Sequence, residues 1–344
     1  MQYFLGSYVV TIIGIILAYL WGEHVHNGTG LVSVFIVLVL SILEVSLSFD
    51  NAVVNAIKLE KMNEKWRRRF LTWGIAIAVF GMRFLFPVLV VAIFAQISLI
   101  EVTKIAFTNP IQYAEYLHQT HAPIVSFGGA FLMMLFFSFF FNDEKEIHWI
   151  KDIEKKLQLF GNIKGAETIM TLLALFVIQA HEASQQKLFV VLSGISGIII
   201  FLLIDGITGW LEKRDEESTK LIATTVRGAG LIGFLYLELI DASFSLDGVL
   251  GAFALSSDIL IITIGLSIGA MFVRSLTIML VEKKTLGKYV YLEHGAHWAI
   301  GALAVIMLIS SFHEVPEVIT GLIGLAFIVM ALISSMIHNK RVKN

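Results

Sequence analysis

Long apolar runs alternate with short charged stretches along the whole chain, and this pattern predicts a protein that crosses a membrane many times. A helix needs about 20 apolar residues to span the hydrocarbon core of a bilayer. Runs of this kind lie near residues 3–21, 31–57, 70–97, 122–141, 165–181, 187–211, 228–254, 258–281, 293–311 and 316–337. We therefore predict an all-α polytopic membrane protein with about ten transmembrane helices.

The composition agrees with this prediction. Hydrophobic residues make up 57% of the chain and charged residues 15%, with a mean hydropathy of +0.82, whereas soluble domains carry about 25% charged residues. The chain has no cysteine, which excludes disulfides and thiolate metal ligands. It has no signature of a nucleic-acid-binding protein.

The basic residues gather in alternate loops and indicate the orientation. Of the 25 Lys and Arg residues, 21 lie after the second, fourth, sixth and eighth apolar runs and in the C-terminal tail. Cytoplasmic loops of membrane proteins are enriched in Lys and Arg. We therefore expect both termini in the cytoplasm and the protein in the cytoplasmic (inner) membrane of a bacterium.

Two short acidic motifs are versions of each other, 197 positions apart. E-V-S-L-S-F-D runs from Glu44 to Asp50, and D-A-S-F-S-L-D runs from Asp241 to Asp247. Superposition matches acid with acid and serine with serine: Glu44 with Asp241, Ser46 with Ser243, Ser48 with Ser245, and Asp50 with Asp247. Carboxylates are costly inside a bilayer, so a duplicated acidic motif marks a functional site.

The motifs lie five predicted helices apart and therefore cross the membrane in opposite directions. This predicts two inverted halves of five helices each, the arrangement of many secondary transporters. The first half covers residues 1–181 and the second residues 187–337, followed by a basic cytoplasmic tail at 338–344. Residues 143–160 form an amphipathic segment, which lies either on the inner membrane surface or in solvent as a connector.

Helical spacing gathers polar side chains on one face of each motif helix. At about 100° per residue, these faces hold Glu44, Ser48 and Asn51 in the first motif and Glu238, Asp241 and Ser245 in the second. An unbroken helix would turn Asp50 and Asp247 away from these faces. Because Ser, Asp, Asn and Gly weaken helical backbone, we predict local unwinding near 50–51 and 247–248. Unwound carbonyl groups would add oxygen ligands.

Acids outnumber arginines in the predicted membrane region. Each ionised acid costs roughly 2.5–3.5 kcal/mol at the centre of a membrane helix, so the surplus acids require protons or bound cations. Oxygen ligands without thiolates suit Mg²⁺, Ca²⁺ or Mn²⁺. The candidate metal ligands are Glu44, Asp50, Asn51, Glu238, Asp241 and Asp247. The supporting residues are Ser48, Ser245, Arg83 and Arg274, the two arginines as counter-ions, gates or snorkelling anchors.

Other polar residues have less specific interpretations. Scattered loop histidines are usually solvated, although those on the outer side could guide a cation or sense pH: His24, His26, His118, His121, His181 and His313. H-G-A-H, from His294 to His297, has a spacing that either binds a metal or serves the fold. Asp205 has no motif around it and is assigned a local structural role.

Three motifs resemble those of the tellurium-resistance TerC family of integral membrane proteins. E-V-S-L-S-F-D-N-A-V in the second run is similar to the first family signature, G-M-R-F-L-F-P to the span that follows, and D-A-S-F-S-L-D-G-V to the second acidic signature. The chain is longer than the simplest members, as a divergent branch would be. The resemblance implies manganese export. It assigns the cation to the matching positions Glu44, Asp50, Asn51, Asp241 and Asp247, while Glu238 has no acidic counterpart in the first motif.

Together these features predict a secondary transporter in the lipid bilayer that exports a divalent cation, with protons as the counter-ion. Mn²⁺ is the expected cation and Ca²⁺ the alternative. We expect no enzymatic activity, no resident cofactor and no nucleic-acid partner; the oligomeric state is left open. The alternatives are a membrane scaffold that delivers metal to secreted proteins and an intramembrane aspartyl protease built on paired aspartates.

Overall fold

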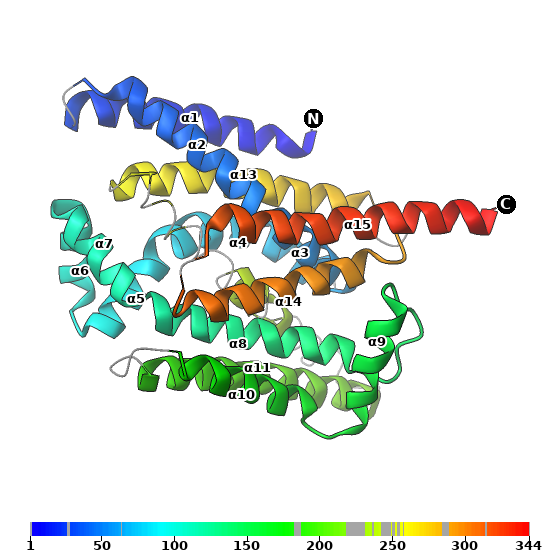
Figure 1. Cartoon of the computed structure of the whole chain (residues 1–344). Helices are drawn as coiled ribbons and strands as arrows, with labels where there is room; N and C mark the ends of the chain where they lie inside the picture. The colour runs from blue at the N-terminus through cyan, green and yellow to red at the C-terminus, as the bar shows by residue number, and fades with distance from the viewer. Residues whose placement is uncertain are drawn as a thin grey trace.

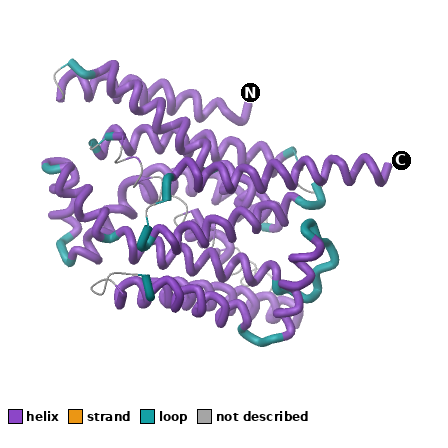
Figure 2. Tube along the Cα trace, in the orientation of Figure 1, coloured by secondary structure: helices purple, strands orange, loops and turns teal. Residues whose placement is uncertain are grey.

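The computed structural model describes residues 2–25, 28–62, 64–181, 187–217, 231–235, 237–241, 249, 252, 255–256, 258–283, 289–313 and 315–343. Every regular element in these ranges is helical (Figure 2), which confirms the predicted all-α class. The helices are η1 (Gln2–Phe4), α1 (Leu5–Val25), α2 (Gly30–Leu47), α3 (Phe49–Lys61), α4 (Glu64–Ala76), the π-helical η2 (Ile77–Leu85), α5 (Phe86–Ala95), α6 (Leu99–Thr108), α7 (Pro110–Gln119), α8 (His121–Phe140), α9 (Lys151–Gln158), η3 (Leu159–Asn162), α10 (Ala166–Gln179), α11 (Lys187–Glu217), α13 (Ile259–Glu282), α14 (Leu292–Ser310) and α15 (Glu317–Lys343). Residues 231–235 and 237–241 are also helical.

Seven helices in the described ranges are long and apolar enough to cross a membrane, and the protein is therefore polytopic. An eighth span results if α9–η3 and α10, which meet at an angle of 108°, are counted as one broken span. Two of the ten predicted spans are not among these. Residues 70–97 are divided between α4, η2 and α5, and residues 228–254 lie largely outside the described ranges. The count of ten and the inverted halves stay predictions.

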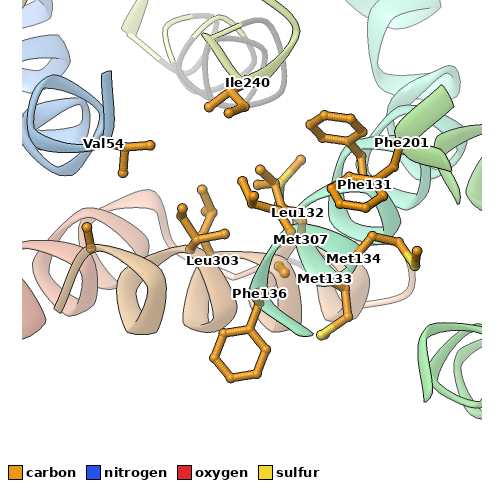
Figure 3. Close-up of a cluster of buried hydrophobic side chains, with 14 of the residues drawn as sticks. Val54, Phe131, Leu132, Met133, Met134, Phe136, Phe201, Ile240, Leu303 and Met307 are labelled. Atoms are coloured by element: carbon orange, nitrogen blue, oxygen red, sulfur yellow. The ribbon is translucent and has the colours of Figure 1, made fainter. Parts of the chain in front are cut away.

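Helix α8 lies at the centre of the bundle. In its apolar stretch 78% of the residues are buried, against 22% in α1 and in α15, whose exposed apolar side chains are left to face lipid. Figure 3 shows Phe131 of α8 beside Phe201 of α11, with Leu303 and Met307 of α14 close to the same helix. Val54 of α3 belongs to the same hydrophobic cluster.

Helix α2 packs against α13 through two glycines. A Cβ atom on Gly265 would lie 2.6 Å from Leu40 Cβ, and one on Gly269 would lie 2.5 Å from Glu44 Cβ. The two glycines form a G-x-x-x-G motif, which allows membrane helices to approach closely. This close approach brings the acidic Glu44 directly against α13.

The two ends of the bundle differ. Both termini and α9 lie toward one end, on the right in Figure 1, and the short helices α6 and α7 lie at the opposite end. Helix α6 begins where Ser98 Oγ accepts a hydrogen bond from the Glu101 backbone, and α7 begins where the Asn109 side chain accepts one from Gln112. The predicted amphipathic segment contains α9, which turns sharply before α10.

Candidate ion site

The first acidic motif lies where α2 passes into α3. The helix is interrupted at Ser48 (φ −102°, ψ 16°), two residues before the predicted unwinding. The Ser48 N–H still donates to the Glu44 carbonyl at 2.9 Å, and the Ala52 N–H donates to the Ser48 carbonyl at 3.2 Å. These two carbonyl groups therefore stay hydrogen-bonded across the break, and the additional carbonyl ligands expected near 50–51 stay a prediction. The second predicted unwinding lies outside the described residues.

This junction lies deep in the bundle. At about 1.5 Å per residue, Glu44 is roughly 20 Å from the start of α2, and Asn51 is roughly 15 Å from the end of α3. Leu40, one turn before Glu44, belongs to one hydrophobic cluster, and Val54, after Asn51, belongs to the other. The polar side chains of the motif thus lie between two apolar layers.

Arg83, from the π-helical η2, connects the two halves of the sequence. Its guanidinium donates to Glu44 Oε1 and forms a buried ion pair with it. The same guanidinium lies 3.8 Å from Asp241 Oδ2. Ser48 Oγ donates to Glu44 Oε1 at 3.0 Å, and Asn51 Nδ2 donates to Asp241 Oδ1 at 2.8 Å. Motif residues 190 positions apart therefore share one network, in which Arg83 lies between Glu44 and Asp241.

A second acid and a second arginine complete the cluster. A Cβ atom on Gly74 of α4 would lie 3.0 Å from both Glu238 Oε1 and Arg274 Nη1, so the absence of a side chain at Gly74 gives both groups room. The Arg274 guanidinium also lies 5.1 Å from the ring centroid of Phe70. Arg274 and Glu238 are each 8% exposed.

These side chains surround a cavity of about 30 Å³, which we call the ion-site cavity. It has room for one ion or one water molecule. Its polar lining residues are Ser48, Asn51, Asn55, Arg83, Glu238, Asp241, Arg274 and Thr277. Among the described residues, Glu238 Oε1 and Asn55 Oδ1 are buried without a hydrogen-bond partner. Leaving such a buried oxygen unsatisfied costs about 1–3 kcal/mol, so an ion or a water molecule bound in the cavity would stabilise both groups.

Most of the predicted site residues line this cavity, and Glu44 lies beside it through its contacts with Arg83 and Ser48. The structure brings together Glu44, Ser48, Asn51, Arg83, Glu238, Asp241 and Arg274. The side chain of Asp50, and Ser245 and Asp247 entirely, lie outside the described part of the chain. Asn55 was not predicted, although it lies one helical turn beyond Asn51 on the same face. Within the described ranges, no three His, Cys, Asp or Glu side chains are grouped to hold a metal ion.

A second buried carboxylate, Glu154 of α9, has a different environment. Its Oε2 accepts hydrogen bonds from the Trp149 backbone at 2.9 Å and from His294 Nδ1 at 2.8 Å. Its Oε1 accepts from the Ile150 backbone at 3.2 Å and from Trp298 Nε1 at 3.0 Å. Burial alone would raise the pKa of Glu154, but the donors His294, Trp298 and Ile150 outweigh it and lower this pKa to about 2.

His294 of the H-G-A-H motif thus holds α9 against α14, while His297 contacts its own helix and α8. His294 contacts Glu154, and His297 Nδ1 lies 2.8 Å from the Glu293 carbonyl. The His297 ring also stacks on Phe139, with centroids 3.5 Å apart. Nothing in the motif itself revealed that Glu154, 140 positions away, would be the partner.

Comparison with known proteins gives a family. The sequence matches the family described as "Protein of unknown function (DUF475)" over residues 49–342. It is also similar to the "Uncharacterized membrane protein YceF" of Bacillus subtilis (strain 168), with 31% identity over 137 residues, which cover 38% of this chain and 52% of that protein. The match thus spans about half the length of that relative. No solved structure matches the chain.

Proposed function

We propose that this chain, which belongs to the family described as "Protein of unknown function (DUF475)", is a secondary transporter of a hard divalent cation. One observation carries the proposal. Two acids, Glu238 and Asp241, and two arginines line a cavity with room for one ion, deep in a membrane-spanning bundle, and a third acid, Glu44, is paired with one of these arginines. Ionised together they leave one negative charge in excess, before Asp50 and Asp247 are counted. Such an excess calls for a cation or a proton.

Arg83 offers a physical route to exchange. It holds Glu44 by an ion pair and lies near Asp241, so a guanidinium occupies the space between two candidate ligands. A divalent cation exerts twice the Coulomb attraction of a guanidinium at equal distance and would compete for the same oxygens. Protons would replace the cation when it leaves, which couples metal movement to proton movement in the opposite direction.

The donors around the cavity are carboxylate, amide and hydroxyl groups, which favour Mg²⁺, Ca²⁺ and Mn²⁺ over softer metals. We favour Mn²⁺, and export over import, because of the resemblance of the Glu44 motif to TerC proteins. Asp50 and Asp247 are proposed as further ligands. We propose that the protein is not an intramembrane aspartyl protease. Asp241 contacts the Asn51 amide and the Arg83 guanidinium, whereas the aspartate of such a protease would contact a second carboxylic acid.

The proposal is tested by the melting temperature of the purified protein with Mn²⁺, Ca²⁺ or Mg²⁺ added. A ligand at 100 times its Kd stabilises a protein by about 2.7 kcal/mol, so the wild type should melt at a higher temperature with Mn²⁺. The Asp241→Asn variant should lose this shift. The control Asp152→Asn, which changes an exposed acid on α9, should keep it. The proposal fails if no divalent cation shifts the wild type, or if Asp241→Asn shifts equally.

A further inference from the structure

A second, much larger cavity lies near the end of the bundle that carries α9 and both termini. Its volume is about 730 Å³, a size typical of sites for small molecules or hydrated ions. We call it the inner cavity. Its walls come from the ends of α3, α8 and α14, from α11, and from the loop at residues 142–147. None of the residues that line the ion-site cavity lines the inner cavity.

The inner cavity and the ion-site cavity share two walls. On α3, Asn51 and Asn55 line the ion-site cavity, while Lys58 and Met62 line the inner cavity. These four residues are spaced by four, three and four positions, which places them on one helical face. Asn55 and Lys58 are separated by only about 4.5 Å of helical rise. A single face of α3, polar from Asn51 to Lys58 and continued by Met62 at the helix end, therefore passes from one cavity to the other.

The segment 231–241 repeats this arrangement on the other side. Gly233 lines the inner cavity, while Glu238 and Asp241 line the ion-site cavity. Gly233 and Met62 are neighbours, since a Cβ atom on Gly233 would lie 3.5 Å from Met62 Cε. The oxygens of Asn55 and Glu238 that are buried without a partner among the described residues belong to these same two walls.

The wall formed by the loop is firmly held. Gln158 Nε2 donates to the Asp143 carbonyl at 2.8 Å and to the Lys145 carbonyl at 3.0 Å. Glu154 fastens the following helix to α14 through His294. The inner cavity is therefore a built feature of the bundle. Its lining holds more acids than lysines, which suits a hydrated cation: the acids are Glu144, Glu146, Asp205 and Glu293, and the lysines are Lys58 and Lys145.

We infer that the inner cavity is the antechamber from which a hydrated divalent cation enters the ion site, with Lys58 as the charged gate between them. This inference rests on the proposed function. The acids of the inner cavity attract the hydrated ion. The ammonium group of Lys58, about one turn beyond Asn55 toward the inner cavity, opposes its passage by like-charge repulsion. The positive-inside pattern assigns this end of the bundle to the cytoplasm, so loading occurs from that side.

Cysteine accessibility tests the antechamber directly, because the natural chain has no cysteine. Ser138 of α8 is exposed and lines the inner cavity. Ser138→Cys should react with a positively charged, membrane-impermeant methanethiosulfonate in inside-out vesicles and not in right-side-out vesicles. The matched control on the same helix is Ser126→Cys, since Ser126 is fully buried and donates to the Val190 carbonyl; it should stay unreactive in both. Unreactive Ser138→Cys, or equal labelling from both sides, would overturn the assignment.

Mn²⁺ flux in reconstituted vesicles tests the gate. Labelling of Ser138→Cys should slow Mn²⁺ entry from the cytoplasmic side several-fold. Lys58→Gln should speed entry several-fold while leaving the Mn²⁺-induced melting shift unchanged, and the exposed-lysine control Lys151→Gln should match the wild type. If Lys58→Gln has the same Mn²⁺ flux as the wild type, Lys58 is not the gate.

The two proposals fail in different ways. Suppose that Mn²⁺ raises the melting temperature but labelled Ser138→Cys transports at the unlabelled rate. This result would support the ion site and contradict the antechamber. Suppose instead that Mn²⁺ does not shift the melting temperature while Ser138→Cys is still labelled only from the cytoplasmic side. This result would contradict the proposed function, and the inner cavity would still be open to the cytoplasm.

Discussion

Glu44 and Glu154 are both 1% exposed, yet their surroundings differ in kind. Glu154 receives four hydrogen bonds, two on each oxygen, from one imidazole, one indole and two backbone groups. Glu44 lies in a cluster that contains two arginines, two further acids and a small cavity. The same residue type at the same burial therefore lies in two different electrostatic environments.

The difference lies in what is left unsatisfied. When both oxygens of a carboxylate accept hydrogen bonds, the donors stabilise its ionised form. Such a carboxylate does not need a further ligand. In the Glu44 cluster, charge is only partly balanced, and the neighbouring Glu238 Oε1 has no partner among the described residues. In the proposed function, this difference in hydrogen bonding and charge balance, more than burial, separates the structural acid Glu154 from the acids of the ion site.

The largest effect on stability should come from Arg83→Ala. Removal of one partner of a buried ion pair leaves an uncompensated charge and costs about 3–5 kcal/mol. We expect Arg83→Ala to unfold in detergent at far lower temperature than the wild type. The control is Arg68→Ala, because Arg68 pairs with Glu64 at 2.7 Å on an exposed helix face and such pairs contribute about 0–1 kcal/mol. Equal melting of the two variants would show that the cluster does not need its arginine.

Glu154→Gln should destabilise the fold by about 1.5–3 kcal/mol, the contribution of a hydrogen bond to a charged group. The amide keeps the shape of the side chain but cannot accept on its nitrogen, so the contact to α14 weakens. Denaturant or thermal unfolding in detergent measures this loss. The Mn²⁺-induced melting shift should persist in the variant. Loss of that shift would show that Glu154 takes part in Mn²⁺ binding and does not only stabilise the fold.

The Glu154 contact also predicts a pH dependence. Because its pKa falls from about 4.5 to about 2 on folding, its stabilising effect is complete above pH 4.5 and is lost as the pH falls through 2. The difference in melting temperature between wild type and Glu154→Gln should be constant from pH 5 to 8 and should shrink progressively between about pH 4.5 and 2. A difference that stays constant throughout this acid range would contradict the assignment.

A smaller effect is expected at Gly74. A methyl group there would lie 3.0 Å from Glu238 Oε1 and from Arg274 Nη1, so Gly74→Ala should displace both groups by a few tenths of an ångström. We expect a several-fold weaker Mn²⁺ affinity. Gly206→Ala is the control, because no atom lies within 4 Å of its added Cβ. Equal affinities of the two variants would mean that the second arginine does not shape the site.

The spacing of polar residues in the sequence predicted which side chains of the first acidic motif lie together at the ion site. Glu44, Ser48 and Asn51 share a face because a helix repeats every 3.6 residues, and the small interruption at Ser48 does not destroy that phase. The two arginines were found because charges inside apolar runs are rare. The same local logic would have found the start of α6, where Ser98 precedes Glu101 in a capping pattern.

Features that depend on distant contacts were not predictable in this way. Glu154 was expected only as part of an amphipathic segment, because its partners on α14 are brought close by the packing of α8 and α9. The π-helical geometry around Arg83 likewise has no signature in a single sequence, although π-helical turns are common at functional sites. The inner cavity arises from five separate parts of the chain.

The most direct test of the account is Mn²⁺ flux into proteoliposomes that contain Glu44→Gln or Glu154→Gln, normalised to folded protein. Both variants remove the charge of an equally buried glutamate. We predict that Glu44→Gln loses at least about tenfold in flux, equivalent to about 1.4 kcal/mol, while Glu154→Gln retains the flux of the wild type. Full flux in Glu44→Gln, or an equal loss in both variants, would contradict the central claim.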